Sequence, residues 1–121
     1  MEAPTLISPD YTKGFFIFSF SSYDTVAAAL LQKNDEGLDH PITFFIRTLR
    51  DAELKYDPIE KHAYTLIKSL KSFRIYILHA KIIAYVPSAV VKDVLTQTDI
   101  DGKRAKWISK LIEFDVEVKP T

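Results

Sequence analysis

The stretch YDPIEKHAYTLIKSLKSFRIYIL, from Tyr56 to Leu78, constrains the fold more than any other part of the chain, because it predicts a long amphipathic helix. Asp57 is a suitable N-cap, and Pro58 suits the first helical position. One face of this helix carries apolar side chains at intervals of three and four residues: Ile59, Ala63, Leu66, Ile67, Leu70, Phe73 and Ile77. Such a face must be buried, so we expect the helix to cross over one face of a sheet.

Three short apolar segments precede this helix and predict an antiparallel meander. Phe15–Phe20 is rich in aromatic residues and free of charge, as expected of a strand. Residues 42–47, ITFFIR, predict another strand, and a loop with Gly37 at its tip precedes them. Between them, Thr25–Gln32 is ambiguous, because its alanines favour a helix whereas its length and position favour a strand. Short connections between such segments favour antiparallel pairing.

The segments after the long helix predict further parallel additions to the sheet. KIIAYV (residues 81–86) predicts a buried strand that ends at Pro87. Short helices are predicted over Ala89–Leu95 and Arg104–Leu111, and the alternating FDVEV (residues 114–118) predicts a last strand. The chain therefore predicts a single α/β domain over residues 15–121 with a mixed sheet, preceded by a lead-in segment over residues 1–14.

Composition and charge exclude several classes of function. The 121 residues contain no cysteine, which removes disulfides, thiolate zinc sites and cysteine nucleophiles. No apolar run approaches the roughly 20 residues needed to cross a bilayer, and the N-terminus does not have the pattern of a signal peptide. We therefore expect an intracellular protein, cytoplasmic or nuclear, that is not secreted. Sixteen basic residues balance sixteen acidic ones, so nucleic-acid binding would require a local basic patch.

Two groups of basic residues are candidates for such a patch. The first follows the long helix: Lys61, Lys68, Lys71, Arg74 and Lys81. The second surrounds an aromatic residue and is the better candidate for nucleic-acid contact: Lys103, Arg104, Lys106, Trp107 and Lys110. For either group, a solvated helix face is the more usual explanation.

Other polar residues predict no catalytic site. His40, His62 and His79 match no zinc-ligand spacing. Asp24 lies in the predicted turn over residues 21–24, where an aspartate commonly bonds its own backbone.

Several blocks of the sequence, in matching order and spacing, resemble the ribonuclease H-like domain that follows the reverse transcriptase in gypsy-class LTR retrotransposons, especially those of plants. The matching blocks are Ala3-Pro4, Pro9-Asp10, AALLQ (28–32), HPITFFIRTLRDAELKYDPIEK (40–61), LKSFRIYIL (70–78) and GKRAKWISKLIEFDVEVKP (102–120). The resemblance implies a ribonuclease H-like fold with a five-stranded mixed sheet and helices on both faces. It also implies cleavage of the RNA strand of an RNA–DNA hybrid by two Mg²⁺ ions about 3.5–4 Å apart.

The acidic ligands of this family are largely missing. The family's first-strand aspartate corresponds to Phe20, and its fourth-strand aspartate corresponds to Pro87. A fourth acid would lie beyond residue 121, and Ala27 replaces a family glycine in the second strand. The helix acid is matched to Glu60, which is then a vestigial ligand, although Glu60 also occupies the capping-box position three residues after Asp57.

Two functions follow from this resemblance. One is a catalytically silent module without a cofactor, with a structural role or a role in binding a polymerase domain or an RNA–DNA hybrid. The alternative is an active, Mg²⁺-dependent hybrid nuclease of a reverse transcriptase. A single carboxylate cannot hold two ions that prefer to stay hydrated, which favours the silent module.

Overall fold

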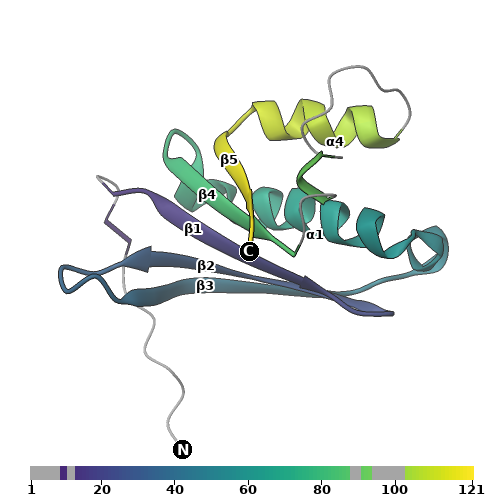
Figure 1. Ribbon diagram of the computed structural model, residues 1–121, viewed down its shortest axis with the longest axis horizontal. Coiled ribbons are helices and arrows are strands. Elements are labelled where there is room, and N and C mark those ends of the chain that lie inside the picture. The colour runs from purple at the N-terminus through teal and green to yellow at the C-terminus, as the bar shows by residue number, and fades with distance from the viewer. Residues whose placement is uncertain (1–8, 11–12, 88–90, 94–102) are drawn as a thin grey trace, which may run out of the picture.

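The computed structural model describes residues 9–10, 13–87, 91–93 and 103–121. Its centre is one five-stranded sheet in the order β3-β2-β1-β4-β5 (Figure 1). The strands are β1 (Phe15–Ser21), β2 (Thr25–Lys33), β3 (Asp39–Thr48), β4 (Lys81–Val86) and β5 (Asp115–Pro120). The helices are η1 (Asp51–Lys55, a 3-10 helix), α1 (Pro58–Ser72), α2 (Arg74–Ile77) and α4 (Lys103–Ile112).

The strand pairing confirms the predicted mixed sheet. β1, β2 and β3 form an antiparallel meander, whereas β4 is parallel to β1 and β5 is parallel to β4. The ambiguous segment is a strand, β2, in which Val26, Ala28 and Leu30 alternate into the core. β3 is longer than predicted and includes Pro41, which an edge strand tolerates because one side of its backbone has no partner strand.

The prediction of one helix continuing to Ile77 is wrong at Phe73. The backbone there leaves the helical region, with φ −90° and ψ 3°, and separates α1 from α2. The carbonyl of Phe73 accepts from the N–H of Tyr76 at 2.8 Å and from that of Ile77 at 3.3 Å, so the last turn is tightened. Both Phe73 and Ile77 remain buried, because the break preserves the apolar face.

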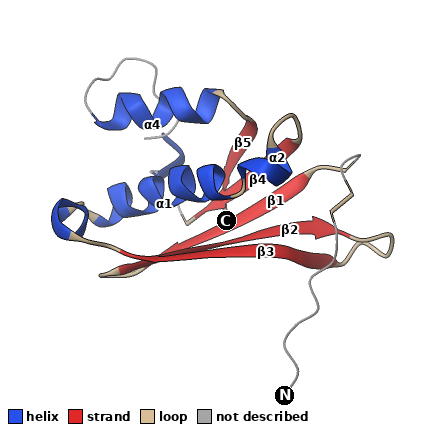
Figure 2. Ribbon diagram, turned by 180° about the vertical axis from the view of Figure 1, so that it is seen from behind, coloured by secondary structure: helices blue, strands red, loops and turns tan. Residues whose placement is uncertain are grey.

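The core lies between one face of the sheet and α1. Its largest buried side chains come from the strands and from the helical segments: Phe15, Ile17, Leu30, Leu66, Leu70, Phe73, Ile77 and Ile82. Figure 1 and Figure 2 show α1 and α4 on this same side of the sheet. The expectation of helices on both faces is therefore not met by the part of the chain that the structure describes.

The remaining predicted elements agree to within two residues at each end where the structure describes them. The predicted helix over Arg104–Leu111 is α4, and the last strand is β5. Of the predicted helix over Ala89–Leu95, residues 91–93 are helical and the others lie outside the described residues, as does most of the lead-in segment. Among the described helices, none combines the length and the apolar character that a membrane span requires.

Candidate functional site

The two positions predicted to have lost an acidic ligand lie beside one another at the ends of β1 and β4. The parallel register pairs Phe18 with Tyr85, so its continuation brings Phe20 next to Pro87. Both residues line a hollow of about 180 Å³, here called the strand-end hollow. Its lining residues are Phe18, Ser19, Phe20, Ser21, His62, Tyr85, Val86, Pro87 and Thr121.

The strand-end hollow is aromatic and hydroxyl-lined, and none of its lining side chains is a carboxylate. The rings of Phe18 and Tyr85 stack at 4.8 Å between centroids and 18° between planes. Phe20 itself is 63% exposed, so its ring lines the hollow from the surface and does not belong to the core. This surface offers stacking and hydrogen bonding, but no negative charge.

His62 is the α1 side chain that reaches the strand-end hollow. Its Nδ1 lies 2.9 Å from the Oγ of Ser21. Burial lowers the pKa of His62, which favours the neutral imidazole at neutral pH. The neighbouring Ser19 Oγ is buried and has no hydrogen-bond partner in the structure.

Glu60, the predicted vestigial ligand, does not line this hollow. Its backbone N–H donates to the Asp57 carboxylate at 2.8 Å, and its own carboxylate accepts from the Asp57 N–H at 3.4 Å. This capping box confirms the alternative role predicted for Glu60. Two helical positions correspond to a rotation of about 200°, so Glu60 and His62 point to nearly opposite sides of α1. His62 is therefore the α1 residue that lines the hollow with Phe20 and Pro87, and the role of Glu60 as a vestigial ligand stays a prediction.

The side chains of the strand-end hollow do not fit a pair of Mg²⁺ ions. Magnesium requires oxygen ligands, and protein sites supply them largely as carboxylates. Across the described ranges, no group of three or more histidine, aspartate and glutamate side chains is placed to hold a metal. The hydroxyls and the imidazole of the hollow supply no charge to offset dehydration of the ion.

The other candidate residues have local structural roles. Asp24 accepts from the hydroxyl of Thr25 at 3.1 Å, and its carbonyl accepts from the N–H of Leu49 at 2.7 Å, so the bonds of this turn residue go to a neighbouring side chain and to the residue directly after β3. His40 lies 2.6 Å from the amide of Asn34. His79 is exposed and has φ 78°, in the turn between α2 and β4.

The first predicted basic group does not form one continuous row. Lys61 is buried, donates to the carbonyl of Tyr23 at 2.7 Å and lies 4.9 Å from the centre of the Tyr23 ring. The prediction that Lys61 lies on the solvated side of the helix is therefore wrong, because the turn after β1 folds over this part of α1. Lys81 lies on β4 and lines a separate hollow with Gly14.

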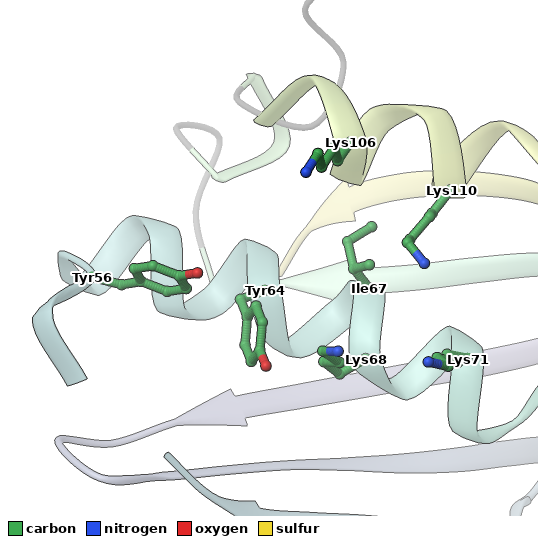
Figure 3. Close-up of a pocket in the computed structure, with 7 residues that line it drawn as sticks. All are labelled: Tyr56, Tyr64, Ile67, Lys68, Lys71, Lys106 and Lys110. Atoms are coloured by element: carbon green, nitrogen blue, oxygen red, sulfur yellow. The ribbon is translucent and has the colours of Figure 1, made fainter. Parts of the chain in front are cut away.

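Part of each basic group meets between α1 and α4. A cavity of about 280 Å³, here called the lysine cavity, has these lining residues: Tyr56, Tyr64, Ile67, Lys68, Lys71, Lys106 and Lys110 (Figure 3). In the sequence these lysines fall into two separate groups, and no local pattern indicates that the groups converge. The side chains of Lys103, Arg104 and Trp107 lie outside the described residues, so their predicted contact with nucleic acid stays a prediction.

Comparison with protein families adds the identity of the domain. A family model described as "RNase H-like domain found in reverse transcriptase" matches residues 10–114. The chain is 29% identical over 115 residues to the retrovirus-related Pol polyprotein from transposon 297 of Drosophila melanogaster, covering 95% of the chain and 10% of that protein. It is 27% identical over 126 residues to the transposon Tf2-3 polyprotein of Schizosaccharomyces pombe, covering 98% of the chain and 9% of that protein. The chain thus spans about a tenth of these relatives.

Solved structures share the fold at low sequence identity. The native prototype foamy virus protease-reverse transcriptase matches with a TM-score of 0.77 and 16% identity, over 96% of this chain and 16% of that chain. The foamy viral protease-reverse transcriptase in complex with an RNA/DNA hybrid matches with a TM-score of 0.76 and 20% identity, with the same coverage. Both comparisons establish that the ribonuclease H-like fold, with its five-stranded mixed sheet, is present here.

Proposed function

Since the chain belongs to the family of RNase H-like domains found in reverse transcriptases, we propose that it is a catalytically silent member of that family. We further propose that the domain derives from the polyprotein of a gypsy-class LTR retrotransposon of the plant type. The sequence blocks at residues 40–61 and 102–120 support this origin. The role of the domain is to hold or brace a partner, either a reverse transcriptase polymerase domain or an RNA–DNA hybrid.

One observation carries this proposal: the strand-end hollow contains no carboxylate. Phe20 and Pro87 occupy the two strand ends, and His62 occupies the position on α1 that faces them. A two-metal mechanism needs acidic ligands at this place both to hold the ions and to position the attacking water. Fold alone does not grant activity, so the retained sheet and helix are compatible with a silent domain.

The proposed binding role is supported by two features. The foamy viral relative of the same fold is described in complex with an RNA/DNA hybrid. The foamy viral protease-reverse transcriptase, which matches this chain with a TM-score of 0.71, is also described in complex with double-stranded DNA.

The test combines calorimetry with a cleavage assay. Mg²⁺ and Mn²⁺ are titrated into the protein, and a labelled RNA–DNA hybrid is incubated with the protein and each metal, then analysed on a gel. We expect no saturable heat of metal binding and no cleavage above the protein-free control. A gel shift with the same hybrid measures binding separately from cleavage.

Glu60→Gln and His62→Gln are the informative variants. Metal-dependent cleavage that disappears in Glu60→Gln would refute the silent role and would identify an active nuclease with a different ligand set. Cleavage that disappears only in His62→Gln would show that the strand-end hollow is catalytic without carboxylates. Cleavage that neither variant affects would be attributed to a contaminating nuclease only if repurification removed it; cleavage that persisted would also refute the silent role.

A further inference from the structure

The lysine cavity is built by two helices that each present a pair of lysines on one face. Lys68 and Lys71 are three residues apart on α1, and Lys106 and Lys110 are four residues apart on α4. These spacings place the members of each pair next to one another on the helix surface. Figure 3 shows lysines from both helices around the side chain of Ile67.

The nearby acidic side chains are already occupied by arginines. Glu53 forms an ion pair with Arg47 at 3.0 Å and also accepts from the hydroxyl of Tyr64. Glu113, which lines a neighbouring hollow together with Ile67, forms an ion pair with Arg74 at 2.9 Å. Within the described part of the chain, none of the four lysines of the cavity forms an ion pair.

Lys68 is partly buried and lies close to other positively charged side chains. Its Nζ lies 5.4 Å from the centre of the Tyr64 ring, and the side chain is half-buried. Burial lowers the pKa of Lys68, and the charges of Lys71, Arg47 and Lys110 lower it further, against an opposing effect of Glu53. An anion in the cavity would offset the repulsion among these ammonium groups.

We propose that the lysine cavity binds a compact polyanion of the class of free diphosphates and triphosphates, held by Lys68, Lys71, Lys106 and Lys110. Four ammonium groups around about 280 Å³ match a ligand that concentrates several negative charges in one small group. A nucleic-acid backbone carries a single charge on each phosphate and spreads these charges along its length. The rings of Tyr56 and Tyr64 also line the cavity, with 5.5 Å between their centroids. This site is independent of the proposed silent role of the strand-end hollow.

The experiment is calorimetric titration of sodium tripolyphosphate into the wild-type protein and into Lys71→Gln/Lys110→Gln. Both lysines are exposed at the cavity rim, so their replacement leaves the core intact, which circular dichroism and thermal melting verify. The control is Lys13→Gln/Lys33→Gln, which removes the same two charges from exposed ion pairs far from the cavity. We expect wild type to bind, the cavity variant to lose at least tenfold in affinity, and the control to lose less than twofold.

Further titrations show whether the natural ligand is a nucleotide or an inorganic polyphosphate. Adenosine triphosphate that binds as well as tripolyphosphate supports the site and assigns it to a nucleotide. Weaker binding of adenosine triphosphate supports the site and assigns it to an inorganic polyphosphate. Equal weakening in both double variants would overturn the proposal, because net charge alone would then explain the binding. Absence of tripolyphosphate binding would also overturn it. If an RNA–DNA duplex nevertheless bound through Lys71 and Lys110, these lysines would belong to a backbone-binding surface.

Discussion

The strand-end hollow and the lysine cavity both border α1, yet they differ completely in charge. His62 is the contribution of α1 to the first, and it is surrounded by aromatic rings and hydroxyls. Ile67, Lys68 and Lys71 are among its contributions to the second, where α4 adds two further lysines. On one side of α1, the strand-end hollow lacks the negative charge that two-metal cleavage requires. On the other side, the lysine cavity has more positive charge than its own contacts neutralise.

The two hollows differ in how much repulsion arises between their own side chains. The strand-end hollow has no cluster of like charges, so it needs neither a metal nor a counterion to be stable. The lysine cavity brings together like charges, which destabilise a helix surface by a few tenths of a kcal/mol for each pair. The proposed anionic ligand would offset this repulsion.

The largest expected effect comes from the wall that gives the lysine cavity its shape. Ile67→Ala removes a buried side chain that also belongs to the core, and we expect it to lower the free energy of unfolding by about 2–4 kcal/mol. Ile75→Ala is the matched control, because Ile75 is 81% exposed, and it should change stability by less than about 0.5 kcal/mol. Both are measured by urea unfolding. Equal effects of the two variants on the free energy of unfolding would show that Ile67 does not contribute to core packing beneath the lysine cavity.

An intermediate effect is expected at Glu53, which accepts a hydrogen bond from the cavity residue Tyr64. Glu53→Gln removes the acid shared by Arg47 and Tyr64, and we expect a loss of about 1–2 kcal/mol in the free energy of unfolding at pH 7. Burial raises the pKa of Glu53, but hydrogen bonds from Tyr64 and from the Arg50 N–H, with the charges of Arg47 and Lys68, lower it overall. The stabilising contribution is therefore present above the pKa of the unfolded state and is lost as pH falls through the lower pKa of the folded state.

Acid titration of stability checks this assignment for Glu53. The difference between wild type and Glu53→Gln should shrink as the pH is lowered from 7 toward the pKa of the folded carboxyl. Glu36→Gln, in the exposed loop before β3, should leave stability unchanged at every pH. A difference between wild type and Glu53→Gln that persists unchanged at low pH would contradict a role for the ionised carboxylate.

The smallest effect on stability is expected when charge is returned to the strand-end hollow. Phe20→Asp replaces a largely exposed side chain, so it should alter stability by about 0.5 kcal/mol or less. It should nevertheless raise the pKa of His62, because a carboxylate near the imidazole favours the protonated form. The measurement is an NMR titration of the His62 ring protons, with Phe44→Asp on the edge strand β3 as the control.

The lowered pKa of His62 also makes the stability of the protein depend on pH. In wild type, burial lowers the pKa of His62, so the unfolded chain binds a proton more readily and stability decreases as pH falls below the usual histidine range. That decrease should be smaller in Phe20→Asp. An unchanged His62 pKa in Phe20→Asp would mean that the introduced carboxylate points away from the hollow.

Much of the fold could be predicted from short-range sequence patterns. The start of α1 depends on residues within one turn, so Asp57, Pro58 and Glu60 were sufficient to predict the capping box. The candidate site was predictable only in part. Phe20 and Pro87 were predicted to be lost ligands, and the parallel pairing of β1 with β4 places them together. That His62, two positions after Glu60, lines the hollow beside them was not predicted, because only the packing of α1 against the sheet decides which side of the helix faces the strand ends.

The sequence by itself determined most of the order of strands and helices, the beginning of α1 and the absence of acid at the ends of β1 and β4. Each of these depends on residue identity or on neighbours within a few positions. Only the tertiary structure decided that Lys61 is buried beneath Tyr23 and that Lys68 and Lys71 meet Lys106 and Lys110. Those contacts join segments more than thirty residues apart, and they depend on how α1 packs against the turn after β1 and against α4, which no local pattern encodes.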